Sequence, residues 1–176
     1  MRTLIAVAAA MAASFVPTAA RAAAPIVYGY PYAAECPAAG LVDAVDRWRM
    51  DECNCTSYVA WALTENGQRT DWFIAGAMDA FNWLHVAELA GLPVGRTPRV
   101  GAVAVWPHAT RFGHVAYVTG LDSGGRFDVA EYNLPLPFAF DERYGLRPAG
   151  AEFIYVPVGR RGAASERLGR VPRPPG

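Results

Sequence analysis

The chain has 176 residues with 16 basic and 16 acidic side chains, so its formal net charge is zero at pH 7. Without Arg2 and Arg21, which belong to the leader described below, the remainder is slightly acidic and lacks the basic surface expected of a protein that binds nucleic acid. The roughly 150 residues after the leader are enough for one domain with its own core, and their number suits a monomer.

Residues 1–24 have the pattern of a cleaved signal peptide. One basic residue precedes an apolar run too short to span a bilayer, and small residues stand in A-x-A register at Ala20, Ala22 and Ala24. An uncleaved membrane anchor is the alternative, but Pro17 and the small-residue tail argue against it. No later segment is long and apolar enough to cross a membrane. We therefore expect a secreted protein, extracellular or periplasmic, without stable membrane insertion.

A single domain is predicted over residues 25–158. Its first part, residues 25–51, is rich in turn-forming and aromatic residues, and we expect it to wrap around the domain without regular structure. Residues 159–176 are rich in Arg, Gly and Pro and lack hydrophobic periodicity, which predicts a disordered tail. The tail is either a solvated end or an electrostatic tether to an anionic wall polymer or lipid.

Two helices are predicted before any strand. The first begins at Cys55 and ends at Asn66 and Gly67, a pair suited to a left-handed C-cap. The second covers residues 77–91 and is terminated by Gly91. The apolar face of this second helix comprises Ala80, Trp83, Leu84 and Ala87.

Strands follow the helices. Alternating or continuous apolar runs bounded by Pro and Gly turns predict strands over residues 100–106, 114–121, 126–132 and 152–158. Helices followed by a run of strands indicate an α+β domain with a mostly antiparallel sheet of about four to six strands.

Three cysteines, Cys36, Cys53 and Cys55, remain after export to a compartment that favours disulfides. The odd number leaves one thiol, and Cys53 and Cys55 are too close in sequence for an easy bridge. We therefore predict a Cys36–Cys53 disulfide, which contributes on the order of 3 kcal/mol through loop closure, and a free Cys55. A zinc site built from Cys53, Cys55 and a histidine is a weaker alternative, because no second Cys or His pair accompanies them. No metal is predicted.

Cys55 has the position of a reactive thiol. Asn54 is a good N-cap residue, and the unpaired amides and dipole at a helix N-terminus stabilise a thiolate. The alternative is that Cys55 is a small buried apolar residue. A cysteine nucleophile also needs a base, usually histidine, that a third polar group orients.

Among the three histidines, His114 is the best candidate base. His85 lies among apolar residues of the second predicted helix and His108 lies in a loop, where a solvated histidine is the usual outcome. His114 follows Gly113 and opens an apolar strand, so its imidazole can face a cleft from a rigid sheet, and the glycine lets another backbone or a substrate approach.

The next strand offers groups that can orient the imidazole. Glu131 and Asn133 stand two residues apart near its end, so in an extended chain both project to the same face. A solvated strand-end carboxylate is the alternative for Glu131.

Four segments of the chain resemble, in order and spacing, the signature segments of the CHAP domain, the cysteine and histidine dependent amidohydrolase and peptidase family. They are CNCTSYVAWAL, PRVGAVAVW, FGHVAYVTGL and FDVAEYN. The resemblance implies a papain-like fold with Cys55 as nucleophile, His114 as base, Glu131 as the carboxylate on the next strand and Asn133 as the polar residue beyond it. Members mostly cleave the bond between muramic acid and L-alanine, or peptide bonds in the stem and cross-bridge of peptidoglycan.

The residues before the nucleophile depart from the family pattern. Many members have glycine and glutamine there, where this chain has Cys53 and Asn54. Asn54 is still a candidate donor to the oxyanion, together with the Cys55 amide. No acidic D-x-D cluster precedes Cys55, so neither a calcium loop nor any cofactor is predicted.

The sequence thus predicts a secreted cysteine hydrolase that cleaves amide bonds of peptidoglycan through a thioester. The alternative is a secreted wall-binding or structural module with the same fold and no turnover. A binding module would keep its wall affinity after Cys55→Ser.

Overall fold

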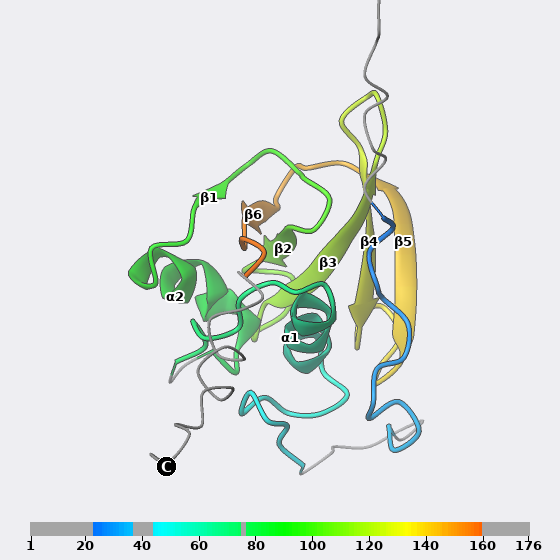
Figure 1. Ribbon diagram of the computed structural model, residues 1–176. Coiled ribbons are helices and arrows are strands. Elements are labelled where there is room, and N and C mark those ends of the chain that lie inside the picture. Colours follow the sequence, from blue (N-terminus) through cyan, green and yellow to red (C-terminus); the bar gives the residue numbers. More distant parts are fainter. Residues whose placement is uncertain (1–22, 37–43, 75–76, 160–176) are drawn as a thin grey trace, which may run out of the picture.

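The computed structural model describes residues 23–36, 44–74 and 77–159 (Figure 1). The predicted leader up to residue 22 and the predicted tail from residue 160 lie outside these residues. Within the described part of the chain, no helix combines the length and the apolar character needed to span a bilayer.

The described residues form an α+β domain, as predicted. Its helical elements are α1 (Cys55–Glu65), the 3-10 turn η1 (Ala80–Asn82) and α2 (Trp83–Leu89). Its strands are β1 (Val94–Gly95), β2 (Val103–Trp106), β3 (His114–Leu121), β4 (Phe127–Tyr132), β5 (Phe140–Leu146) and β6 (Glu152–Ile154). They form one sheet in the order β1-β6-β2-β3-β4-β5, and every neighbouring pair is antiparallel.

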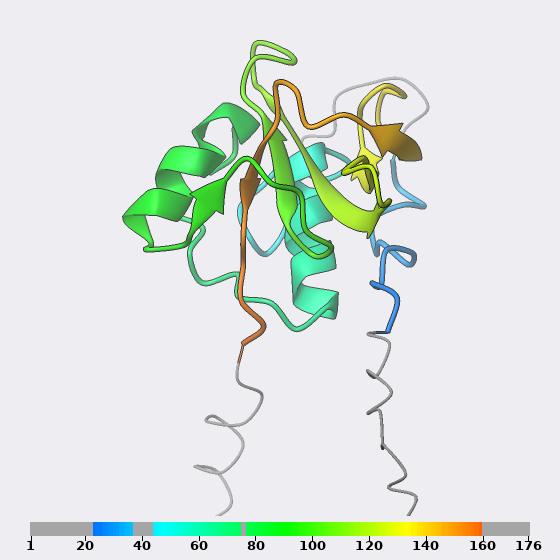
Figure 2. The same ribbon diagram turned by 90° about the horizontal axis from the view of Figure 1, so that it is seen from above.

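Helix α1 packs on the middle of the sheet, against β3 and β4, and α2 lies at the end formed by β1 and β6 (Figures 1 and 2). Eight consecutive residues of α1, from position 56 to 63, are buried. The helix ends as predicted, because Gly67 takes a positive φ of 71° and the Gln68 amide donates to the carbonyl of Leu63 over 2.8 Å.

Side chains of the sheet divide between its two faces. Those in the core shared with α1 include Val103, Val105, Val115, Tyr117 and Ala130. Those in a second buried cluster include Ala104, Ala116, Val118, Phe127, Val129 and Phe153. This alternation follows from the two-residue period of a strand. Both faces of the central strands are therefore buried, which explains why these strands read as nearly continuous apolar runs.

The second helix is shorter than predicted. The prediction covered residues 77–91, whereas the structure has a 3-10 turn followed by the seven residues of α2. The indole of Trp83 donates to the carbonyl of Ala77 over 2.7 Å, and Asp79 is extended, so the first residues form a turn. Trp83 is buried as predicted, while Leu84 is only partly buried.

Strands β1 and β5 were not predicted from the sequence. Strand β1 has only two residues, and β5 carries Asp141, Glu142 and Arg143 in succession, so it lacks the apolar alternation that marks a strand. The predicted strands over 100–106 and 152–158 are also shorter in the structure, since Gly101 takes a φ of 84° and the Tyr155 amide pairs with Pro93 rather than with β2.

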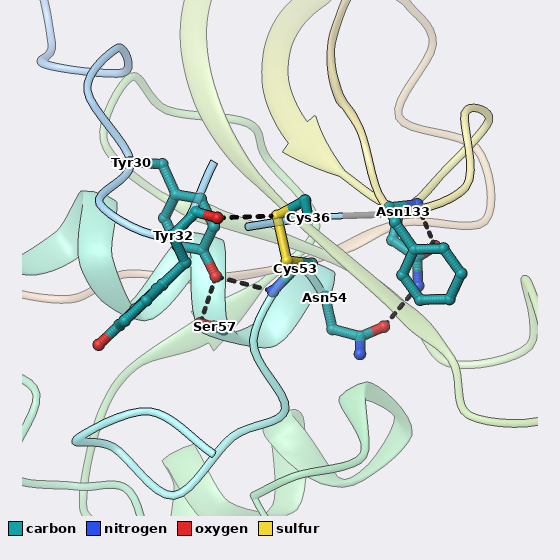
Figure 3. Close-up of a disulfide and its surroundings, with 8 residues drawn as sticks. Tyr30, Tyr32, Cys36, Cys53, Asn54, Ser57 and Asn133 are labelled. Atoms are coloured by element: carbon teal, nitrogen blue, oxygen red, sulfur yellow. Dashed lines mark hydrogen bonds between the residues drawn. A yellow bond between two sulfur atoms is a disulfide. The ribbon is translucent and has the colours of Figure 1, made fainter. Parts of the chain in front are cut away.

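The N-terminal segment wraps around the N-terminal half of α1 and the end of β4. The Tyr30 ring contacts the rings of Tyr58 and Tyr132, and the Tyr58 hydroxyl donates to the carbonyl of Val27 over 2.7 Å. The Tyr30 hydroxyl accepts a hydrogen bond from the Cys53 amide (3.0 Å) (Figure 3). This segment therefore fixes the backbone just before Cys55.

The predicted disulfide is confirmed. Cys36 and Cys53 are bonded, and Cys55 is free. The bridge ties the N-terminal segment to the residue two positions before Cys55 (Figure 3). Because the sulfur of Cys53 is committed to this bond, the alternative zinc site built from Cys53 and Cys55 has lost one of its ligands.

Candidate active site

Cys55 is the first residue of α1 and is half-buried. Asn54 occupies the N-cap position with an extended backbone, but its side chain makes no capping hydrogen bond. This differs from the expectation that Asn54 caps the helix, because its side-chain oxygen instead accepts a hydrogen bond from Asn133. The amides of the first turn therefore keep their partial positive charge next to the Cys55 sulfur.

His114 is the first residue of β3, where the strand begins beside the N-terminus of α1. The residue is 2% exposed. The preceding Gly113 has a φ of 73°, and a Cβ at this position would lie 2.5 Å from the backbone nitrogen of Phe81. The glycine thus allows the close backbone approach that the sequence suggested, and this approach places His114 at the start of the strand.

Glu131, on β4, is fully buried and contacts the imidazole directly. Its Oε2 lies 2.6 Å from Nε2 of His114. Since Nε2 is engaged by Glu131, the other ring nitrogen, Nδ1, is the one left for Cys55. The arrangement has the order expected of a nucleophile, a base and an orienting group.

The surroundings of His114 determine the protonation of its imidazole. Burial lowers the pKa of His114, whereas hydrogen bonds and charge interactions with Cys55 and Glu131 raise it, and the net effect raises the pKa from 6.5 to about 9. His114 therefore carries its proton at neutral pH. A free thiol beside a charged imidazole is an arrangement that can carry out nucleophilic attack followed by proton donation to a leaving group.

Asn133 does not orient the imidazole as the strand pattern suggested. It has a φ of 62°, which turns it out of the β4 alternation. Its Nδ2 donates to Oδ1 of Asn54 (Figure 3). Its Oδ1 accepts from the Phe138 amide over 2.8 Å. Asn133 therefore holds the oxygen of the Asn54 side chain, and the Nδ2 of this residue, which lines the cleft, takes no part in that contact.

Two further residues contact this group, and sequence reasoning missed both contacts. The Trp106 ring stacks on the His114 ring, with centroids 5.9 Å apart and planes 27° apart. Arg143 contacts both carboxylate oxygens of Glu131. Trp106 is the last residue of a predicted strand, where its sequence position gives no sign of this contact, and Arg143 lies on β5, whose charged sequence kept it from being predicted as a strand. The positions of Glu131 and Arg143 in the sequence do not predict their contact, because the contact depends on how β4 and β5 pair.

The remaining histidines are not part of the site. His108 in the loop after β2 is exposed, as expected, and His85 on α2 is exposed as well. Among the described residues, no three His, Cys, Asp or Glu side chains are grouped so that they could hold a metal ion.

Cys55 and His114 open into a cleft of about 380 Å³. Its walls combine apolar and charged side chains, and the lining includes Asn54, Asp51, Met78, Asp79, Arg111, Phe112, Asn133 and Phe138. Met78 and Phe112 are about half exposed, at 47% and 49%. The cleft can therefore receive an extended chain that has both apolar and polar groups.

Comparisons with known proteins identify a family for the chain. The family model of the CHAP domain matches residues 45–133. Two Staphylococcus aureus (strain NCTC 8325) proteins, the staphylococcal secretory antigens SsaA and ssaA2, are 42% and 40% identical over 55 residues, which are 31% of this chain and 21% and 20% of theirs. The match thus spans about a fifth of the length of these curated relatives.

A solved structure supports the fold. The N-acetylmuramoyl-L-alanine amidase from Staphylococcus aureus superimposes with a TM-score of 0.51 and 24% identity, over 59% of this chain and 30% of that one. The likeness agrees with the expected papain-like arrangement, in which a helix that begins with the cysteine packs on an antiparallel sheet.

Proposed function

The chain belongs to the CHAP domain family, and on that basis we propose that it is an exported cysteine hydrolase that cleaves amide bonds in peptidoglycan. The observation that carries the proposal is the contact of His114 with both Cys55 and the buried Glu131 at the mouth of a cleft. A structural or binding module has no need for a buried carboxylate that keeps an imidazole charged beside a free thiol.

The geometry supports acyl transfer in two steps. The Cys55 sulfur attacks the amide carbonyl carbon, and the C–N bond breaks as His114 gives its proton to the leaving amine. Water then attacks the thioester, His114 accepts a proton from that water, and the C–S bond breaks. The products are a carboxylic acid and an amine, and the His114 proton is restored.

The oxyanion of each tetrahedral intermediate needs donors near Cys55. The backbone amide of Cys55 at the start of α1 is one, and Nδ2 of Asn54 is the second that we propose, because Asn133 occupies the oxygen of the same amide group. A helix N-terminus adds its partial positive charge at the same place.

Peptidoglycan is the substrate that best fits the other features. The relatives named above are secretory antigens, and the superimposed structure is an amidase that acts at muramoyl-L-alanine. A disulfide beside the site suits an oxidising compartment outside the cytoplasm, in agreement with the predicted leader. The bond cut is either the muramoyl-L-alanine amide or a peptide bond of the stem or cross-bridge.

Mass spectrometry of fragments released from purified sacculi tests this proposal. The wild type and Cys55→Ala are compared without reductant, so that the Cys36–Cys53 disulfide stays intact. Free glycan chains with whole stem peptides identify an amidase, and shortened or uncrosslinked stems identify an endopeptidase. If neither product depends on Cys55 in sacculi of several chemotypes, the hydrolase proposal is wrong, and wall sedimentation by Cys55→Ser then supports the binding module.

A further inference from the structure

We propose that Arg143 is a positioning residue for the catalytic pair: it holds the Glu131 carboxylate in the orientation in which that carboxylate contacts His114. The inference rests on the proposed roles of Cys55 and His114. It adds a residue on β5, outside the segments that match the CHAP domain model, which ends at residue 133.

Glu131 needs a second cation. Its carboxylate is completely buried, and a buried charge is stable only when it is paired and hydrogen-bonded. His114 contacts Oε2 alone, at 2.6 Å. A single contact would leave Oε1 without a partner and would let the carboxylate rotate about its Cγ–Cδ bond.

Arg143 supplies the contact to Oε1 of Glu131 that His114 does not make. Its Nε donates to Oε1 of Glu131, and its Nη2 donates to Oε2 over 2.8 Å. The planar guanidinium therefore engages both oxygens and fixes the plane of the carboxylate. Oε2, which accepts from Arg143 and His114 together, is kept in place for the imidazole.

The sheet register produces this contact. Arg143 pairs with Val129 on β4, two residues from Glu131, so Glu131 and Arg143 project from the same face as diagonal neighbours. On the other side of His114, Trp106 of β2 is its direct register partner. The Arg143 Cζ lies 5.2 Å from the centroid of the Trp106 ring, which itself stacks on His114. Arg143 thus contacts Glu131 and Trp106, two of the residues that contact the imidazole.

The positive charge of Arg143 also balances negative groups around Glu131. The ionisable groups that face Glu131 are His114 from β3, Arg143 from β5, Asp141 from β5, which is the register partner of Glu131, and, beyond the imidazole, Cys55 from α1. Without Arg143, the Glu131 carboxylate would lie opposite that of Asp141, and the imidazolium of His114 would be the cation that contacts it. The side chain of Arg143 is 31% exposed, so solvent reaches it from the far side of the carboxylate.

A double-mutant cycle tests the role without any wall substrate. The readout is the rate at which iodoacetamide alkylates Cys55 at pH 6, followed by mass spectrometry of the peptide that contains it. We expect Arg143→Met to slow alkylation about tenfold, within the range of coupling between contacting residues. Glu131→Gln should slow it at least as much. Arg143→Met added to Glu131→Gln should slow it by less than about twofold more, because the arginine acts through the carboxylate.

The matched control is Arg99→Met. Arg99 also lies over an aromatic ring, that of Tyr155 at 4.2 Å, but on the β6 side of the sheet, and its loss should leave the alkylation rate unchanged. Equal slowing by Arg143→Met in the wild-type and Glu131→Gln backgrounds would overturn the proposal. A wild-type rate in Arg143→Met, or in Arg143→Lys, which keeps the charge and loses the planar fork, would overturn it as well.

Chemical rescue covers the case in which Arg143→Met folds poorly. In Arg143→Ala, added ethylguanidinium should restore the alkylation rate several-fold, and ethylammonium should not. Rescue by both cations, or by neither, contradicts a role that depends on the planar guanidinium with its two parallel donors. Alkylation requires no peptidoglycan, so a wild type that reacts rapidly but releases no wall fragments disproves the proposed substrate and leaves the inference about Arg143 to its own test.

Discussion

His114 connects the chemistry of the site to pH. Its pKa of about 9 results from Cys55 and Glu131, whose contacts outweigh the effect of burial. Glu131→Gln removes the carboxylate charge, so we expect the alkaline limit of hydrolysis, near pH 9 in the wild type, to move to lower pH. A pH–rate profile of both proteins on the same sacculi measures this. An unchanged alkaline limit would mean that Glu131 does not determine the protonation of His114.

The same pKa predicts how stability depends on pH. The folded-state pKa of about 9 lies above the ordinary value of 6.5, so the charged imidazole stabilises the fold fully below about pH 6.5. That contribution diminishes as the pH rises and is lost above about pH 9. Denaturant unfolding of the wild type should show this decline between the two values, and His114→Asn should flatten it. A decline of equal slope in the variant would assign it to other groups.

The side chains of Asn54 and Asn133 are hydrogen-bonded to each other. Because Asn133 fixes the orientation of the Asn54 amide, we expect Asn54→Ala to lower kcat about tenfold or more through loss of an oxyanion donor. Asn133→Ala should lower it less, and should have almost no further effect in Asn54→Ala. Iodoacetamide alkylation forms no oxyanion, so its rate should stay unchanged in both variants. A loss of less than about threefold in Asn54→Ala would count against the assignment.

At the scale of elements, the start of β3 depends on a close contact with η1. The Phe81 amide donates to the carbonyl of Phe112 over 3.0 Å, and this brings the Phe81 backbone against Gly113. Gly113→Ala combines a positive φ with a Cβ 2.5 Å from backbone, so we expect it to destabilise the fold by about 2 to 4 kcal/mol.

Gly125→Ala is the control for that prediction. Gly125 has a nearly identical φ of 75°, but nothing lies within 4 Å of the Cβ that alanine would add. Thermal unfolding should therefore show a much smaller loss for Gly125→Ala than for Gly113→Ala. Equal losses would show that the positive φ, and not the contact with Phe81, is what requires glycine at the start of β3.

At the scale of the whole molecule, the N-terminal segment is attached to the rest of the domain beside the nucleophile. The Cys36–Cys53 bridge spans 17 residues of sequence. Replacing both cysteines by alanine should cost about 3 kcal/mol, which lowers Tm by about 6 to 12 °C for a domain of this size. Calorimetry without reductant measures the change, and reductant should lower the Tm of the wild type but not of the variant. An unchanged Tm in the variant would mean that Tyr30 and its neighbours hold the segment without the bridge.

Several features of the fold could be predicted because they depend on residues close in sequence. The termination of α1 at Asn66 and Gly67 and the bounds of β3 match the prediction, since local capping and apolar patterns determine them. The pairing of Cys36 with Cys53 followed from the number and spacing of the cysteines. The contact of His114 with Cys55 and Glu131 was expected from the types and order of these residues, although their proposed roles await the experiments above.

Other features depend on contacts that no local pattern encodes. The Glu131–Arg143 contact requires the register between β4 and β5, and β5 carries three charged residues where an apolar alternation would have marked a strand. Asn133 was expected to share the face of Glu131, but its positive φ directs it to Asn54, and only the turn that closes on Phe138 decides this. The sequence by itself determined the reactive residue types and the elements that carry them. The tertiary structure decided which polar groups meet, because those contacts arise from strand pairing and close backbone approach between distant segments.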